Sequence, residues 1–259
     1  MSETIPRIFQ VVEFLADSDD WVSLRTMSRE LHINATATFR ILNALKELGY
    51  VRQDSQDSKY QLTLKIAGIS AQVLEKVQLR QIAHPFLQQL TSTSNETTHL
   101  AILDGKDFVY IDKVDNTQAM RMRSRVGQHG LLHCTAMGKA LLAHYPPADL
   151  SKILEGLDFQ PRTNQTITDP AKFLEQLEQI RQQGFAVDDE ENETGIRCIG
   201  SPIFDHAGRL GGAVSISGWT ISMTHERLAE LAPELLQTCQ KVSQALGFPG
   251  GKETPGQIR

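Results

Sequence analysis

The sequence lacks the features that mark several large classes of protein. No apolar run approaches the roughly 20 residues that a membrane-spanning helix needs, and no basic-then-apolar segment opens the chain. Cysteine is scarce: Cys134, Cys198 and Cys239 are far apart, odd in number and not part of any Cys-x-x-Cys pair. Neither a disulfide scaffold nor a structural zinc site is therefore indicated. We expect a cytoplasmic protein that holds no metal and no cofactor.

The chain also lacks an excess of positive charge. Its 259 residues carry a formal net charge of −5. Residues 1–63 hold only seven Lys and Arg against nine Asp and Glu, although residues 21–60 hold six basic residues against four acidic ones. Binding to nucleic acid requires a locally basic face rather than a basic protein. The charge pattern therefore permits DNA binding without indicating it.

A helical pattern over residues 34–48 is the most informative signal that is present. Apolar side chains recur at spacings of three and four on one face, and polar ones, including Thr36 and Arg40, recur on another. Asn34 is a favourable N-cap, and Gly49 favours the end of the helix. A shorter helix is predicted over residues 23–31, and only two residues separate it from Asn34. Two short helices joined so tightly cross steeply, which predicts a helix-turn-helix.

A β-hairpin is predicted directly after these helices. Residues 50–52 and 59–62 are β-prone and flank the polar turn of residues 53–58. A helix-turn-helix followed by a hairpin is typical of a winged DNA-binding domain. Thr38 also belongs to the apolar face of its helix and is the weakest candidate for a DNA contact. The side chains that we expect to contact DNA are those of Arg25, Asn34, Thr36, Thr38, Arg40, Arg52, Lys59 and Tyr60.

Residues 64–82 are predicted to form a linker helix between the two halves of the chain. Ile66, Ile69, Val73 and Val77 recur at spacings of three and four and share one face. Two interpretations stay open. The helix is either the first core helix of the next domain or a connecting helix that also dimerises the protein. The helical pattern continues beyond it, with an interruption or kink expected at Pro85.

The second half of the chain changes to a β-type period. Strands are predicted over residues 98–103, 108–114, 120–126, 196–204 and 210–217, and helices over residues 135–144, 149–155, 170–183 and 225–246. A sheet made mostly of hairpins, with helices packed on it, is an α+β domain rather than a doubly wound one. The predicted division is a DNA-binding domain of residues 1–63, the linker, an effector-binding domain of residues 83–248 and a flexible tail of residues 249–259.

Four segments, in their order and spacing, resemble one known family. They are INATATFRILNALKELGYV, LLHCTAMGKALLA, GFAVDDEENETGIRCIGSPIFD and GGAVSISG. The chain resembles the isocitrate lyase regulator (IclR) family of bacterial transcription factors along essentially its whole length. The resemblance implies a winged helix-turn-helix, a linker helix and a C-terminal effector-binding domain of GAF/PAS-like fold. It also implies a homodimer or dimer of dimers on palindromic, double-stranded operator DNA. Relatives often carry Ser or Lys early in the recognition helix, where this chain has NATAT, so their base preference cannot be carried over.

The resemblance further implies a pocket for a small carboxylate effector. Free amides at a helix start suit an anion, while a buried carboxylate and serine hydroxyls suit a polyol. Within the family, the segment THLAILDGKDFVYIDKVD and the arginine-rich run RMRSR most resemble a repressor of sugar-acid catabolism. From that resemblance we expect a repressor that is released by an effector such as 2-keto-3-deoxygluconate. The alternative is a simple core, in which Cys198 is a small buried hydrophobe. The family's pocket positions correspond to Met122, Gly130, Ala136, Met137, Asp188, Cys198, Ser215 and Ser217.

Two other motifs have more than one interpretation. Arg121, Arg123 and Arg125 share one face of the strand predicted over residues 120–126. They form either a nucleic-acid patch or a solvated face from which one side chain reaches the ligand carboxylate. A zinc pair at His129 and His133 is disfavoured, because they lie on a glycine-containing loop rather than on a helix.

An enzyme fused to a DNA-binding module is the alternative function. Cys198 or a serine would be its nucleophile, which needs a base within reach and a partner that orients the base. His99, His133 and His206 are candidate bases, but no local motif pairs any of them with Cys198. We therefore expect a regulator that is not an enzyme.

Overall fold

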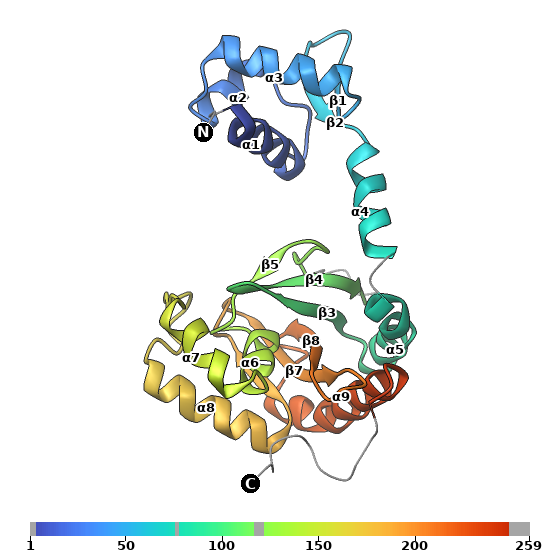
Figure 1. Ribbon diagram of the computed structural model, residues 1–259, viewed down its shortest axis with the longest axis vertical. Coiled ribbons are helices and arrows are strands. Elements are labelled where there is room, and N and C mark those ends of the chain that lie inside the picture. Colours follow the sequence, from blue (N-terminus) through green and yellow to red (C-terminus); the bar gives the residue numbers. More distant parts are fainter. Residues whose placement is uncertain (1–3, 76–77, 117–121, 249–259) are drawn as a thin grey trace. The chain divides into compact units, whose positions relative to one another are not determined.

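The computed structural model describes residues 4–75, 78–116 and 122–248 (Figure 1). The chain divides into two units, Met1–Lys76 and Val77–Arg259, and each is described by itself. The predicted tail lies outside the described residues, and the predicted domain boundaries stay predictions. None of the described helices has the length and hydropathy of a membrane-spanning segment.

The first unit is a winged helix-turn-helix. Both helices of the motif begin at a capping side chain: Ser23 accepts a hydrogen bond from the Thr26 amide, and Asn34 accepts one from the Ala37 amide. The two strands pair antiparallel, which confirms the predicted hairpin. The elements are α1 (Thr4–Asp17), α2 (Leu24–Glu30), α3 (Ala35–Glu47), β1 (Val51–Gln53), β2 (Tyr60–Leu62) and α4 (Lys65–Glu75).

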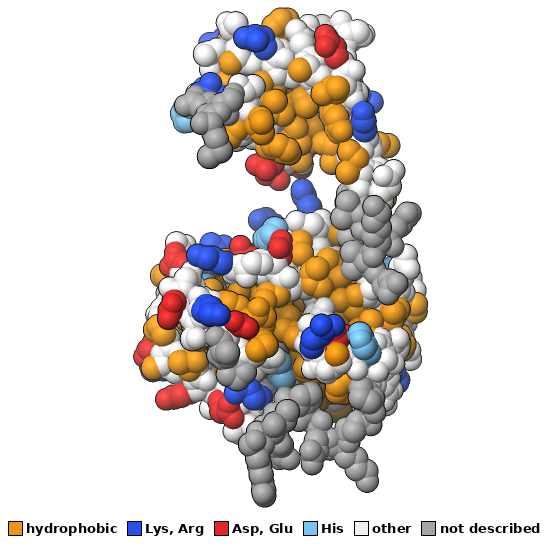
Figure 2. Space-filling model, in the orientation of Figure 1, with side chains coloured by type: hydrophobic (Ala, Val, Ile, Leu, Met, Phe, Trp, Pro, Cys, Tyr) orange, Lys and Arg blue, Asp and Glu red, His pale blue; other side chains and the backbone are white. Residues whose placement is uncertain are grey.

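One apolar core joins α1, α2, α3 and the hairpin. It fixes which face of α3 points outward, because the helix buries Ile41, Leu42 and Leu45. Hydrophobic side chains also gather on the surface of this unit (Figure 2), where Ile5 and Phe9 of α1 are exposed. The core consists of Val11, Leu15, Val22, Met27, Ile33, Ile41, Leu42, Leu45, Val51 and Tyr60.

The second unit is built on a six-stranded antiparallel sheet with the order β5-β4-β3-β8-β7-β6. The pairs β3–β4 and β7–β8 are hairpins, as predicted. In the centre of the sheet β3 pairs with β8, which places His99 opposite Ser215. The strands are β3 (Thr97–Asp104), β4 (Asp107–Val114), β5 (His129–Gly130), β6 (Ala186–Asp189), β7 (Ile196–Phe204) and β8 (Leu210–Trp219).

Helices cover both faces of this sheet (Figure 1). On one face, α5 (Gln78–Ser94) and α9 (His225–Ala245) pack against each other and against the strands. The opposite face carries α6 (Ala136–Ala143), α7 (Pro147–Glu155) and α8 (Pro170–Gln183). There, α6 and α8 share an apolar core with β3 and β8. The fold is therefore of the predicted α+β class.

The strand predicted over residues 120–126 is a wrong prediction for residues 122–126, which form no regular secondary structure. The first two residues of the predicted strand lie outside the described part of the chain. Instead, Gly127 and Gln128 bond to the backbone of Tyr110 in β4. An alternating sequence indicates which side chains face inward, but a strand also needs a hydrogen-bonding partner along its length.

The predicted linker helix corresponds to two elements. Helix α4 ends at Glu75, whereas α5 starts at Gln78 and runs through Pro85 without a break. In the predicted apolar stripe, Ile66 is half-buried and Ile69 is exposed. The other two members of the stripe have no described side chains, so its role in dimerisation stays a prediction.

Candidate functional site

A polar cavity of about 130 Å³ lies in the second unit, between the sheet and the start of α6. Gly200 on β7 allows this arrangement, because a Cβ atom there would lie 2.9 Å from the carbonyl group of Ala136. Without a side chain at residue 200, the start of α6 can lie directly against the sheet. The loop after β6 and the irregular segment of residues 122–128 contribute further lining residues, and the cavity is open to solvent.

Most of the predicted effector-binding residues line this cavity. Gly130 does not: it lies in β5 opposite Phe108, and a Cβ atom there would overlap the Phe108 ring. We therefore assign Gly130 to the packing of β5 rather than to the site. The predicted residues that the structure brings together are Met122, Ala136, Met137, Asp188, Cys198, Ser215 and Ser217.

Further residues line the cavity that the sequence did not assign to it. His99 was missed because it lines the cavity only through the pairing of β3 with β8, which places it opposite Ser215. Alternation along β3 predicts that His99 and Ala101 share a face, but the sequence does not show which strand lies beside β3. Arg123 and Arg125 of the predicted strand are both exposed, and of these two Arg123 lines the cavity. The additional lining residues are His99, Tyr110, Arg123, Ser124, Gln128, Thr135, Asn192, Glu193 and Ile196.

The start of α6 offers backbone donors to the cavity. Thr135 caps the helix, since its hydroxyl accepts a hydrogen bond from the Gly138 amide at 3.0 Å. The Lys139 amide donates to the Thr135 carbonyl. The amides of Ala136 and Met137 precede that bond and therefore have no partner within the helix. Together with the positive end of the helix dipole, they favour an anion at this wall.

The opposite wall consists of a neutral histidine and two serines. His99 Nδ1 lies 3.4 Å from Ser215 Oγ and 3.5 Å from Ser217 Oγ, and His99 Nε2 lies 2.7 Å from Ser124 Oγ. Burial, followed by the nearby charge of Lys113, lowers the pKa of His99 to about 3, although the charge of Asp115 opposes this shift. The ring is therefore neutral at physiological pH, with one nitrogen that donates and one that accepts. Such a wall suits ligand hydroxyl groups.

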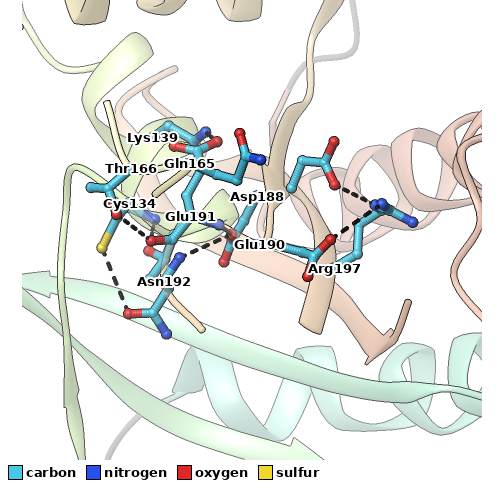
Figure 3. Close-up of polar contacts among 12 residues, drawn as sticks. Cys134, Lys139, Gln165, Thr166, Asp188, Glu190, Glu191, Asn192 and Arg197 are labelled. Carbon is cyan, nitrogen blue, oxygen red and sulfur yellow. Dashed lines mark hydrogen bonds and ion pairs between the residues drawn. The ribbon is translucent and has the colours of Figure 1, made fainter. Parts of the chain in front are cut away.

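Asp188 is the buried carboxyl group of the cavity (Figure 3). Its Oδ1 atom accepts hydrogen bonds from the backbone amides of Glu191, at 2.8 Å, and Asn192, at 3.3 Å. Burial raises the pKa of Asp188 to about 7, although the charge of Lys139 opposes this shift. Asp188 is therefore present in both protonation states near neutral pH.

The thiols near the cavity are not activated as nucleophiles. Burial, followed by the nearby charge of Asp188, raises the pKa of Cys198 far above its usual range. The same two causes raise the pKa of Cys134 to about 12. Because the thiolate rather than the thiol is the nucleophile, the geometry gives no support to catalysis at Cys198.

The two histidines of the disfavoured zinc pair have separate environments. His129 is exposed and lies 3.8 Å from Asp104, whereas His133 is buried, with its Nε2 atom 3.0 Å from the carbonyl oxygen of Gln160. Among the residues that the structure describes, no group of three or more His, Cys, Asp or Glu side chains is arranged to hold a metal ion.

The predicted DNA-contacting residues of the first unit fall into two groups. Arg25, Asn34, Thr36 and Arg40 are exposed on α2 and around the start of α3. In the wing, Arg52 is exposed, with its guanidinium 5.0 Å from the centre of the Trp21 ring. Lys59 lies at the turn of the hairpin, with its ammonium 3.1 Å from the carboxylate of Asp57 on the surface.

Thr38 and Tyr60 are instead part of the core of the first unit. The Thr38 hydroxyl accepts a hydrogen bond from Ser28 and donates one to the Asn34 carbonyl, each at 3.1 Å. The Tyr60 ring is 2% exposed, and its hydroxyl accepts a hydrogen bond from Gln53. Neither side chain can reach DNA in this arrangement, so we remove both from the set of predicted contacts.

A winged helix-turn-helix with an exposed, polar recognition helix, followed by an α+β unit with a polar cavity, is the architecture of a transcriptional regulator. Residues 4–55 match the model of the IclR helix-turn-helix domain, and residues 71–244 match that of the bacterial transcriptional regulator IclR C-terminal domain. The chain belongs to the IclR family of bacterial transcriptional regulators. The members of this family that it matches are regulators and not enzymes, which confirms that prediction.

Relatives match the chain over almost its full length. It is 35% identical over 245 residues to the HTH-type transcriptional regulator KdgR of Escherichia coli (strain K12), which covers 95% of this chain and 93% of KdgR. It is 32% identical over 247 residues to the regulator XynR of the same strain, and this match covers 95% of this chain and 98% of XynR. The structure also matches the crystal structure of the Thermotoga maritima IclR with a TM-score of 0.83 and 35% sequence identity. This match covers 95% of this chain and 99% of that chain. These similarities extend to both units of the fold.

Proposed function

We propose that this protein represses genes of sugar-acid catabolism by binding operator DNA, and that a small carboxylate such as 2-keto-3-deoxygluconate releases it. The observation that carries the proposal is the cavity, in which the start of α6 faces a wall of neutral hydrogen-bonding side chains. The sugar-acid class is further supported by the similarity to the regulator KdgR of E. coli.

The ligand would use both walls of the cavity. Its carboxylate would accept hydrogen bonds from the amides of Ala136 and Met137, because an unpaired carboxylate is too costly to bury. Its hydroxyl groups would bond to Asp188, Ser215 and Ser217. The side chains of the two lining methionines would cover its apolar carbon chain. A ligand that lacks either the carboxylate or the hydroxyl groups leaves one wall unsatisfied.

On DNA, the exposed face of α3 would lie in the major groove. Thr36 and Arg40 would lie at the base edges, with Arg25 and Asn34 near the adjacent backbone. The arginine and lysine of the wing would hold phosphate groups, which position the unit without reading the sequence. Effector can shift this equilibrium only through unequal affinity for the DNA-bound and released conformations. Relief of about tenfold requires ~1.4 kcal/mol of coupling.

Titration with 2-keto-3-deoxygluconate tests the proposal directly. An operator is first selected from random DNA with the full-length protein, and its binding is then followed by fluorescence anisotropy. We expect the effector to weaken operator binding about tenfold, whereas glucose, which lacks the carboxylate, has no effect. An operator affinity that does not change, together with no heat of binding in calorimetry at millimolar effector, would show that the cavity is not an effector site for this ligand class.

We also expect the protein to be a homodimer or a dimer of dimers, with Ile66 and Ile69 of α4 partly buried between subunits. Two recognition helices would then meet half-sites about one helical turn, or a multiple of it, apart. Light scattering should give at least a dimer at micromolar concentration. Ile69→Glu should shift the mass towards the monomer and weaken operator binding, while Ile221→Glu, at a residue that is 89% exposed in the second unit, serves as the control. A wild-type monomer with and without operator would rule out this assembly.

A further inference from the structure

Lys139 and Glu191 form a buried ion pair beside the cavity (Figure 3). Lys139 is fully buried in the middle of α6, and Glu191 is 5% exposed in the loop that follows β6. Neither side chain lines the cavity itself. A buried ion pair contributes little net stability compared with well-packed apolar residues of similar size. Its location therefore points to a role other than the stability of the core.

The pair joins the two polar walls that the proposed effector needs. On one side, the Lys139 amide closes the first turn of α6, whose start presents the free backbone donors. On the other side, the Glu191 amide donates to Asp188 Oδ1 at 2.8 Å, and the Asn192 amide donates to the same atom at 3.3 Å. One side-chain contact thus connects the anion-binding wall to the wall that carries Asp188.

The loop side of the pair is held in place from outside the cavity. The hydroxyl of Thr166 donates to the Glu191 carbonyl at 2.6 Å, and that of Thr163 donates to the Glu190 carbonyl at 2.6 Å. Within the described part of the chain, Glu191 Oε2 is buried without a hydrogen-bond partner. Lys139 is therefore the group that compensates the charge of this carboxylate, and loss of Lys139 would leave the charge buried and unpaired.

We propose that Lys139 and Glu191 are positioning residues of the effector site. Their ion pair fixes the distance between the start of α6 and the loop after β6, whose amides hold Asp188. A bound carboxylate with hydroxyl groups requires that distance. This inference rests on the proposed function, because it assigns the pair to the same site. The pair does not touch the ligand. It fixes where the two groups of hydrogen-bonding atoms lie, and a carboxylate with hydroxyl groups must satisfy both groups at once.

The two charges also act on Asp188 through space, and with opposite signs. Burial raises the pKa of Asp188, the charge of Lys139 lowers it, and the charge of Glu191 raises it. Loss of Lys139 should therefore raise the pKa of Asp188, and loss of the Glu191 charge should lower it. The other titratable or charged groups around Asp188 are His99, Tyr110, Arg123, Cys134, Glu193 and Cys198.

The test compares the neutral double variant Lys139→Met/Glu191→Gln with the wild type in the full-length protein. The double variant removes both members of the pair and so leaves neither charge buried without its partner. It should therefore be more stable than either single variant. The control is Lys152→Met/Asp149→Asn, which removes an ion pair of 2.9 Å that is exposed on α7. Without ligand, hydrogen exchange should be faster in the double variant at both residues 136–137 and residues 191–192. The control should exchange as the wild type does.

With ligand, calorimetry should show that the double variant binds 2-keto-3-deoxygluconate about tenfold more weakly, while ligand-free operator affinity stays within about twofold of wild type. A purely structural role would not move the pH profile of effector affinity. We expect Lys139→Met to shift the midpoint of that profile to higher pH and Glu191→Gln to shift it to lower pH.

If the wild type binds no 2-keto-3-deoxygluconate, the proposed function fails, and hydrogen exchange alone decides whether the pair connects the two walls. If hydrogen exchange at residues 136–137 and 191–192 were as slow in the double variant as in the wild type, the inference would be overturned. Faster exchange combined with an effector affinity and pH profile identical to those of the wild type would overturn it equally.

Discussion

Replacing Arg40 with alanine is expected to weaken operator binding by about 1–3 kcal/mol and to relax the base preference at one position of each half-site. Arg40 is exposed on α3, whose other face is fixed in the core by Ile41, Leu42 and Leu45. The helix therefore cannot rotate to replace the lost contact. A guanidinium at this position can donate two hydrogen bonds to the major-groove edge of guanine. Anisotropy with the selected operator, and with operators that carry one changed base pair, measures both effects.

Lys59→Ala is the matched control for this prediction. Its ammonium lies in the hairpin beside Asp57, and an exposed pair of this kind competes only weakly with a phosphate group. The variant should bind all sequences more weakly by the same factor, and the slope of log affinity against log salt should fall by about one. If Arg40→Ala lost affinity uniformly across all operators, Arg40 would be a phosphate contact rather than a base contact.

The helix-turn-helix could be predicted closely from the sequence because its signals are local. Helical spacing, the caps at Ser23 and Asn34, and the turn after residue 52 depend on neighbouring residues alone. The two runs predicted to form the hairpin do pair antiparallel, and this prediction also used neighbouring residues alone. Such features need no knowledge of the rest of the chain.

Thr38 and Tyr60 show where a local pattern has two solutions. Thr38 satisfies its hydroxyl within the motif, through Ser28 and the Asn34 carbonyl, so it can occupy the apolar face of α3. Tyr60 also forms a backbone bridge with Val22 outside the hairpin, and both residues belong to the apolar core of the first unit. A hydroxyl in an apolar stripe can thus be buried when a hydrogen-bond acceptor lies one helical turn away. The spacing of polar and apolar residues alone does not show whether such an acceptor is available.

The cavity was predictable only in part, because it depends on contacts between distant segments. Alternation along one strand indicates that Ser215 and Ser217 share a face. His99 joins them because β3 lies beside β8, and the order of strands in a sheet is not encoded by any one segment. The pair of Lys139 and Glu191 is hidden for the same reason, since 52 positions separate its members. Sequence reasoning would count each as an ordinary surface charge.

Asp188→Ala is expected to abolish the effector response while ligand-free operator affinity stays near that of the wild type. The substitution removes the buried carboxyl group of the cavity and the acceptor for the amides of Glu191 and Asn192. The ligand then loses a hydrogen-bond partner and the loop loses its anchor, whereas the first unit is unchanged. Operator binding with and without 2-keto-3-deoxygluconate measures both quantities. An effector response of wild-type size would exclude Asp188 from the site.

Asp188→Asn separates the charge of this residue from its shape. In the folded protein the pKa of Asp188 is raised from 3.8 to about 7, so the charged form is disfavoured and the contribution of Asp188 to stability decreases as the pH rises through this range. The affinity for the effector should depend on pH with the same sign, because an anionic ligand in the cavity disfavours a negative charge on Asp188. Wild-type effector affinity should therefore fall as the pH is raised from about 6 to about 8. Asparagine keeps the Oδ1 acceptor but cannot ionise, so the affinity of Asp188→Asn should be nearly independent of pH over that interval. Calorimetry at several pH values gives both profiles, and a variant that retains the wild-type slope would assign the pH dependence to a different group.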